Sequence, residues 1–108
     1  MSALAEAVPA LFAFRSGGSR REGWGRIERL TPLRARLATR APVPEGAEVE
    51  VSFTLEGTPL RSLLCLADGM GTDEDGGRWL ELAFQRREDM VRLRKAIERL
   101  AWTPRPET

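Results

Sequence analysis

The sequence predicts a mostly β fold, in which an antiparallel barrel of short strands is followed by one amphipathic α-helix. Three observations predict it. Residues 47–55 alternate apolar and polar side chains with a strict period of two, which is typical of a strand with one buried face. After Arg87 the apolar period changes to that of a helix. Turn signals separate the other short apolar segments, and closing such strands into a barrel leaves no strand edge exposed.

The length and composition predict one folded domain over residues 1–108. Hydrophobic residues make up 42% and charged residues 31%, as in a folded soluble protein. No apolar run is long enough to cross a bilayer, and residues 1–14 lack the pattern of a signal peptide, so we expect a cytoplasmic location and no membrane insertion. Within the domain we expect a partly flexible segment over 1–22, a helix over 88–102 and a tail over 103–108.

The expected elements follow from local composition and period. Residues 1–14 form either a short helix or a strand, and polar composition predicts loops over 15–23 and 68–77. Thr31-Pro32 predicts a turn, because proline fixes its own φ and pushes the preceding residue into an extended conformation. The expected strands cover residues 24–31, 35–39, 47–55, 60–67 and 79–85.

The expected helix carries one apolar stripe, because Met90, Leu93, Ile97 and Leu100 recur at helical spacing. Acidic residues fall in its first turn, where negative charge suits the helix dipole. The stripe has to be buried, so we expect the helix to cover one opening or one flank of the barrel.

Several classes of chemistry are excluded by the residues present. The chain has no histidine, which removes Ser-His-Asp and Cys-His catalysis. Its single cysteine, Cys65, excludes an internal disulfide and a thiolate zinc site, and its apolar neighbours predict a small buried side chain. The acidic loop 72–77 faintly resembles a calcium loop, but the twelfth position counted from Asp73 is Phe84, an expected core residue. We therefore expect no enzyme, no metal and no cofactor.

Arginine is the remaining candidate for binding chemistry. Residues 15–40 carry a balance of +6, whereas residues 41–85 carry −7, and all but one of the 17 basic residues are arginine. Arginines beside a small barrel can clamp phosphates, with Trp24 as a stacking face. The other interpretation, which we favour, is a solvated basic loop with Trp24 in the core.

Three segments resemble the PilZ domain of bacteria, over about residues 12–102. They are Gly-Arg-Ile-Glu-Arg-Leu-Thr-Pro-Leu-Arg-Ala-Arg-Leu (25–37), Pro-Glu-Gly-Ala-Glu-Val-Glu-Val-Ser-Phe-Thr-Leu (44–55) and Trp-Leu-Glu-Leu-Ala-Phe (79–84). The resemblance implies a six-stranded antiparallel barrel with a C-terminal helix. Many members of that family are receptors for cyclic di-GMP.

The ligand motifs of that family are largely missing here. The usual Asp/Asn-x-Ser-x-x-Gly motif at a strand junction falls on Arg29, Thr31 and Arg34, so only the hydroxyl is kept. The usual earlier Arg-x-x-x-Arg motif has no counterpart before Arg29. The resemblance therefore implies a degenerate member that has lost the nucleotide site, like adaptors of type IV pilus and surface-motility systems that act through protein contacts.

Our leading hypothesis is a bacterial, non-enzymatic signalling or motility adaptor that does not bind cyclic di-GMP tightly. Its expected contact surfaces are the polar outside of the barrel, the helix, and the N-terminal segment with Leu11, Phe12 and Phe14. The alternative is a cyclic di-GMP receptor that uses a rearranged arginine set. A nucleic-acid-binding barrel is disfavoured by the −7 segment and by the lack of aromatic pairs. The candidate ligand-binding residues are Arg15, Arg20, Arg21, Arg29, Thr31 and Arg34.

Overall fold

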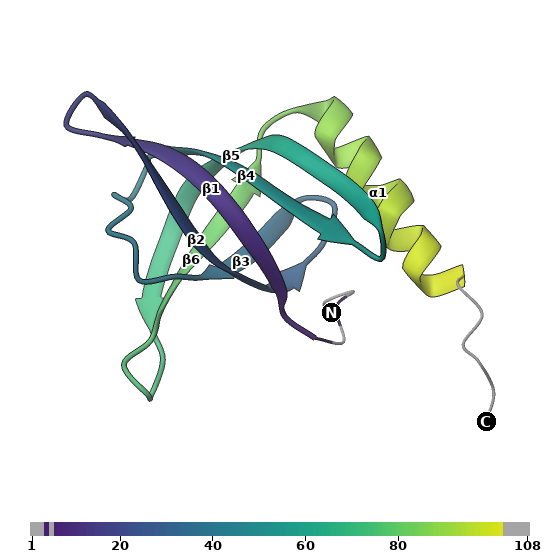
Figure 1. Ribbon diagram of the computed structural model, residues 1–108, viewed down its shortest axis with the longest axis horizontal. Helices are drawn as coiled ribbons and strands as arrows, with labels where there is room; N and C mark the ends of the chain where they lie inside the picture. Colours follow the sequence, from purple (N-terminus) through teal and green to yellow (C-terminus); the bar gives the residue numbers. More distant parts are fainter. Residues whose placement is uncertain (1–3, 5, 103–108) are drawn as a thin grey trace.

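The computed structural model describes residue 4 and residues 6–102, which form six strands and one helix. The strands pair antiparallel and close into a barrel in the order β1-β2-β3-β6-β5-β4 (Figure 1). This confirms the mostly β fold class, while the expected tail over 103–108 lies outside the described residues. The elements are β1 (Val8–Ser16), β2 (Ser19–Leu30), β3 (Arg34–Ala38), β4 (Glu48–Leu55), β5 (Thr58–Thr72), β6 (Arg78–Phe84) and α1 (Arg87–Trp102).

The barrel interior is filled by the inward positions of all six strands. In β4, the alternation predicted from the sequence is confirmed, because Val49, Val51, Phe53 and Leu55 are all buried. Cys65 is fully buried among these side chains, as expected. The largest fully buried side chains include Ile27, Leu30, Leu37, Leu60, Leu63, Leu80, Leu82 and Leu93.

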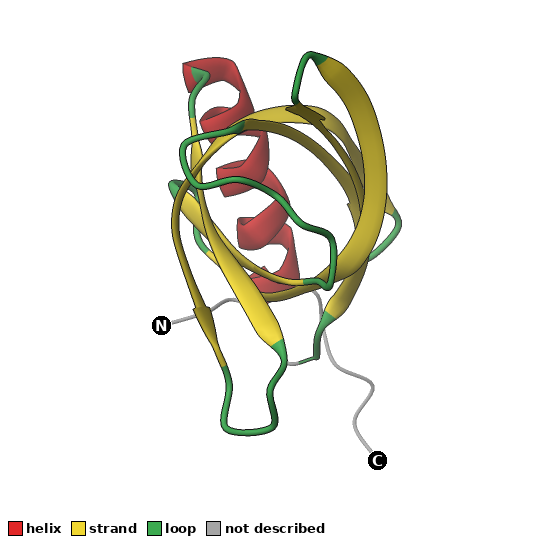
Figure 2. Cartoon of the chain, turned by 90° about the vertical axis from the view of Figure 1, so that its left-hand side faces the viewer, coloured by secondary structure: helices red, strands yellow, loops and turns green. Residues whose placement is uncertain are grey.

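Helix α1 crosses one end of the barrel (Figure 2). Leu93 and Ala96 are buried in the core, and the rest of the predicted stripe packs against it. Asp89, only 3% exposed, accepts a hydrogen bond from the backbone N–H of Leu64 at 3.3 Å and pairs with Arg92 at 3.6 Å. Asp89 therefore fastens the first turn of α1 to β5, beyond the dipole role that the sequence predicts. Among the described residues, no helix has the length and apolar character needed to span a membrane.

The loop expected over residues 15–23 is wrong. Residues 8–16 form β1, so the strand alternative holds for the N-terminal segment, and β2 already begins at Ser19. Only Gly17 and Gly18 turn the chain, with φ of 60° and 83°, the left-handed conformation that a two-residue hairpin turn requires. The polar composition was misleading because residues 19–22 are all exposed, and such a hairpin needs no apolar side chains.

The loop expected over residues 68–77 is wrong in its first half, because β5 continues to Thr72. Gly69 and Gly71 lie beneath the β6 side chains of Glu81 and Trp79, and a Cβ at Gly71 would overlap the Trp79 ring. The indole covers the glycine backbone and stabilises the strand there. The composition of residues 68–77 cannot predict a contact of this kind, because the covering side chain lies on another strand.

Candidate functional site

The structure divides the six sequence-predicted site residues between two ends of the barrel. Arg15, Arg20 and Arg21 lie in the β1–β2 hairpin, and the others lie at the β2–β3 turn. Arg20 and Arg29 share strand β2 and are about 30 Å apart along it at about 3.3 Å per residue. The Phe84 N–H donates to the carbonyl of Leu33 at 3.0 Å, which places the β2–β3 turn at the end where α1 begins. The hairpin lies at the other end (Figure 1).

At the β2–β3 turn, the polar groups are mostly used by the protein itself. The Thr31 hydroxyl accepts hydrogen bonds from the N–H groups of Leu33 and Arg34 at 3.2 and 3.0 Å and donates to the Arg34 carbonyl at 3.3 Å. The Arg34 guanidinium pairs with Asp68 at 2.6 Å, and this hydrogen bond and charge raise the pKa of Arg34. Arg29, by contrast, is exposed. The Thr31 hydroxyl, at the position of the serine in the PilZ motif that the sequence resembles, is thus occupied in closing the turn.

Arg36, which faces Arg29 across the two strands, is also engaged. It donates to Glu81 at 3.0 Å, and its guanidinium carbon lies 4.2 Å from the centre of the Trp79 ring. Both contacts favour keeping this cation on the barrel wall. Of the arginines at this junction, two are therefore partnered within the chain.

In the β1–β2 hairpin, Arg15 and Arg20 are direct cross-strand partners. They line a hollow of about 410 Å³ together with Glu48 and Glu50, and no ion pair joins these four side chains in the described structure. Arg21 is exposed opposite Phe14. Arg34, at the opposite end of the barrel, is not brought into this group.

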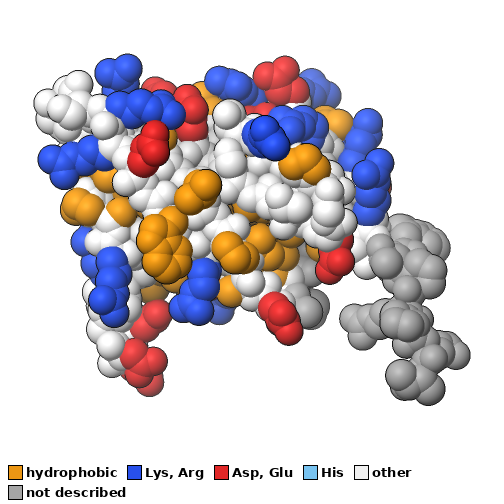
Figure 3. Space-filling view, in the orientation of Figure 1, with side chains coloured by type: hydrophobic (Ala, Val, Ile, Leu, Met, Phe, Trp, Pro, Cys, Tyr) orange, Lys and Arg blue, Asp and Glu red, His pale blue; other side chains and the backbone are white. Residues whose placement is uncertain are grey.

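The largest exposed apolar side chains on the barrel wall are Trp24 and Leu11, at 71% and 69% exposed, and they are direct cross-strand partners on β2 and β1. The interpretation that placed Trp24 in the core is wrong. Phe12 and Phe14 are each only 3% exposed, so of the expected N-terminal contact residues only Leu11 faces solvent. Figure 3 shows apolar side chains on this face of the molecule.

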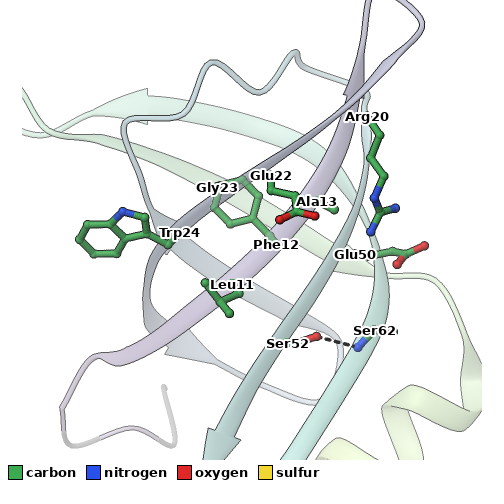
Figure 4. Close-up of a pocket in the computed structure, with 10 residues that line it drawn as sticks. All are labelled: Leu11, Phe12, Ala13, Arg20, Glu22, Gly23, Trp24, Glu50, Ser52 and Ser62. Carbon is green, nitrogen blue, oxygen red and sulfur yellow. Dashed lines mark hydrogen bonds between the residues drawn. The ribbon is translucent and has the colours of Figure 1, made fainter.

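Trp24 borders three of the hollows on the described surface. One, of about 440 Å³, has Leu11, Arg20 and Glu50 on its walls (Figure 4). A second, of about 790 Å³, extends past Leu11 toward Arg61. The third, of about 600 Å³, has Arg26, Arg40 and Arg78 among its lining residues. The tryptophan thus forms a ridge between surface hollows.

A strained part of β5 borders both of the first two hollows. Ser62 has a positive φ of 53°, and its N–H donates to the Ser52 hydroxyl at 2.9 Å. A non-glycine residue in this conformation costs about 1 kcal/mol or more, and such residues cluster at functional sites. The strain lies on the same outer face as Trp24 and Leu11.

The sequence contained a signal for the position of Trp24. Counting back from the buried Ile27 with a period of two places Gly25 and Gly23 inside the barrel and Trp24 outside. The glycines on either side let neighbouring groups approach closely. The Phe12 ring lies over Gly23, and the Thr39 hydroxyl donates to the Trp24 carbonyl at 2.9 Å.

Within the described part of the chain, no three His, Cys, Asp or Glu side chains are grouped so as to hold a metal ion. Burial, and secondarily the charge of Asp89, raises the pKa of the Cys65 thiol to about 12. Both effects keep the Cys65 thiol protonated near neutral pH, where a free cysteine is already partly thiolate.

We therefore expect Cys65 to be inert in the folded protein. At pH 8, Ellman's reagent should label it only after denaturant is added, because the thiol is both protonated and shielded. Labelling followed by absorbance, with and without denaturant, measures this. Reaction of the folded protein at the rate of a free cysteine peptide would contradict it.

None of the family models matches this chain, and none of the curated proteins matches it. Among solved structures, it is similar to that of the Bacillus subtilis Inhibitor of motility (MotI/DgrA), with a TM-score of 0.61 and 10% sequence identity. The likeness covers 93% of this chain and 52% of that one, so this chain spans about half of that protein's length. The shared fold supports the PilZ-like architecture that the sequence resemblance implies.

Proposed function

We propose that this chain is a non-enzymatic interaction module of PilZ-like fold that binds a protein partner through the outer face of β1 and β2. The observation that carries the proposal is the exposed pair formed by Trp24 and Leu11. Tryptophan is enriched among the residues that dominate binding energy at interfaces. Adjacent large apolar side chains left in water on a rigid sheet are typical of a contact surface.

The same proposal assigns no tight cyclic di-GMP site to the β2–β3 junction. Thr31 is occupied by the turn and Arg34 by Asp68, so a phosphate there would have to compete with an existing ion pair. We further propose a role in bacterial motility signalling, in the cytoplasm and with a pilus or motility protein as partner. The likeness to a protein described as an inhibitor of motility supports the motility part of this role.

Calorimetry with cyclic di-GMP at low salt tests the proposed absence of a tight nucleotide site. We expect no saturable heat at micromolar nucleotide. Saturable binding with a micromolar or tighter Kd would contradict it. Loss of such binding in a variant with Arg20→Ala and Arg21→Ala would favour the receptor alternative instead.

Quantitative affinity purification from the native cell tests the proposed protein contact through Trp24 and Leu11. We expect at least one protein to be recovered with the wild type and lost with Trp24→Ser, because the anchor of the contact is removed. Leu33→Ser is a matched control, because Leu33 is another exposed apolar side chain, at 61%, but lies at the β2–β3 turn and not beside Trp24. If no protein depends on Trp24, or if Leu33→Ser causes the same losses, this surface is not the contact site.

A further inference from the structure

We propose that the partner docks an extended acidic segment, with an apolar side chain among its carboxylates, into one particular hollow beside Trp24. This inference rests on the proposed function and names the chemistry of the partner. The hollow, called here the arginine hollow, has a volume of about 600 Å³. Its charged and aromatic lining residues are Trp24, Arg26, Glu28, Arg40, Asp73 and Arg78.

Three arginines reach this hollow from separate parts of the chain. Arg26 lies on β2, Arg40 follows β3, and Arg78 begins β6. The fold brings them together because Arg26 pairs with Ala38 across β2 and β3, and the Thr39 N–H donates to the Arg78 carbonyl at 3.1 Å. Arg26 and Arg40 belong to the basic stretch 15–40, whereas Arg78 lies outside it, so the sequence alone gave no reason to group the three.

These three guanidinium groups are available to a ligand. None of them forms an ion pair or hydrogen bond through its side chain within the described residues. They contrast with Arg34 and Arg36, which are held by Asp68 and Glu81. An arginine fork matches a carboxylate with two parallel hydrogen bonds, so unpaired forks around one hollow favour an anionic occupant.

The strand register places the apolar pair directly beside the arginines. Pro9 faces Arg26 across β1 and β2, and Leu11 faces Trp24 in the next outward row. An extended peptide projects side chains on one face about 7 Å apart, so it can set a carboxylate beside Arg26 and an apolar group on Trp24. The two kinds of contact fit one continuous segment.

Acidic side chains on the same face argue for a peptide rather than a nucleic acid. Glu28 and Asp73 line the arginine hollow, and Glu22 and Glu50 both flank Ala13 on the far side of the apolar pair. A nucleic acid presents regularly spaced phosphates and would meet these carboxylates. A peptide places its charges selectively and avoids them.

Selection from a random peptide library displayed on phage tests the inference with a defined probe. The wild-type chain is the target, and Trp24→Ser is used for counter-selection. Enrichment of Trp24-dependent peptides that combine Asp or Glu with an apolar residue supports the proposal. Trp24-dependent peptides without acidic residues overturn the acidic-peptide proposal but agree with the proposed contact surface at Trp24. The absence of any Trp24-dependent peptide counts against both the acidic-peptide proposal and that contact surface.

Affinity measurements with the enriched peptide, synthesised with a fluorescent label, locate the site. We expect the double variant with Arg26→Gln and Arg40→Gln to weaken binding at least about tenfold, as loss of one good charged contact does. The control variant with Arg87→Gln and Arg94→Gln changes net charge equally on α1 and should change the Kd less than about twofold. Equal weakening by both variants overturns the proposal. So does tight binding of a labelled single-stranded oligonucleotide that is lost in the first variant alone.

Discussion

Replacing Leu93 by alanine is expected to lower the free energy of unfolding by about 2–5 kcal/mol, the range found when a fully buried leucine is truncated. Leu93 is 0% exposed and, with Ala96, is the part of α1 that enters the core. Its loss leaves a cavity between the helix and the end of the barrel that α1 closes. Denaturant unfolding followed by circular dichroism measures the change.

The matched control for this variant is Lys95→Ala on the exposed side of the same helix. It should shift the free energy of unfolding by less than about 0.5 kcal/mol, because no buried contact is lost. A loss below about 1 kcal/mol for Leu93→Ala would mean that α1 contributes little to the barrel core.

Gly25→Ala is expected to destabilise the protein by about 3 kcal/mol, at the upper end of the effect of overpacking a core. A Cβ at Gly25 would overlap the carbonyl oxygen of Ala38 and lie 3.0 Å from both a Leu37 methyl and the Thr39 Cβ. The carbonyl belongs to the backbone of β3, so relief requires β2 and β3 to separate. The Thr39–Trp24 hydrogen bond that supports the Trp24 ridge would be disturbed as well.

The chain offers a matched control in Gly69→Ala, since Gly69 also lies in a strand without a positive φ. A Cβ there would meet the Glu81 Cβ at 3.5 Å, an ordinary contact. Alanine at this position should be neutral within about 0.5 kcal/mol or slightly stabilising, because it restricts the unfolded chain. If Gly25→Ala and Gly69→Ala change the free energy of unfolding equally, the close packing around Gly25 is not the reason that a glycine is needed there.

Much of the fold is readable from the sequence because burial follows a short period. The alternation in residues 47–55 predicted which side chains of β4 point into the barrel, and the helical stripe predicted that α1 covers either an opening or a flank of the barrel. Where polar or glycine-rich composition hid a strand, as in residues 19–22 and 69–72, the prediction failed. Those residues belong to strands because of partners distant in sequence, such as Trp79 over Gly71.

The candidate site was only partly predictable. Arginine enrichment drew attention to residues 15–40, which include Arg26 and Arg40 of the proposed arginine hollow, and a period of two would have placed Trp24 outside the barrel. Which arginines carry an internal partner depends on neighbouring strands of the sheet, as the pair between Arg34 on β3 and Asp68 on β5 shows. Contacts between side chains on different strands cannot be predicted from nearby residues in the sequence, whereas the alternation within one strand can.

Alternation and helical spacing act over a few residues, so the sequence was enough to predict the architecture, a strand barrel with a terminal helix. It also carried the resemblance to the PilZ family, with Arg29 and Arg34 at the positions where that family's motif has Asp or Asn and Gly. Which charged side chains remain without an internal partner depends on the three-dimensional fold. Strand β3 pairs with both β2 and β6, which leaves Arg26, Arg40 and Arg78 around one hollow beside Trp24. Strand β5 lies on the other side of β6, and its Asp68 pairs with Arg34.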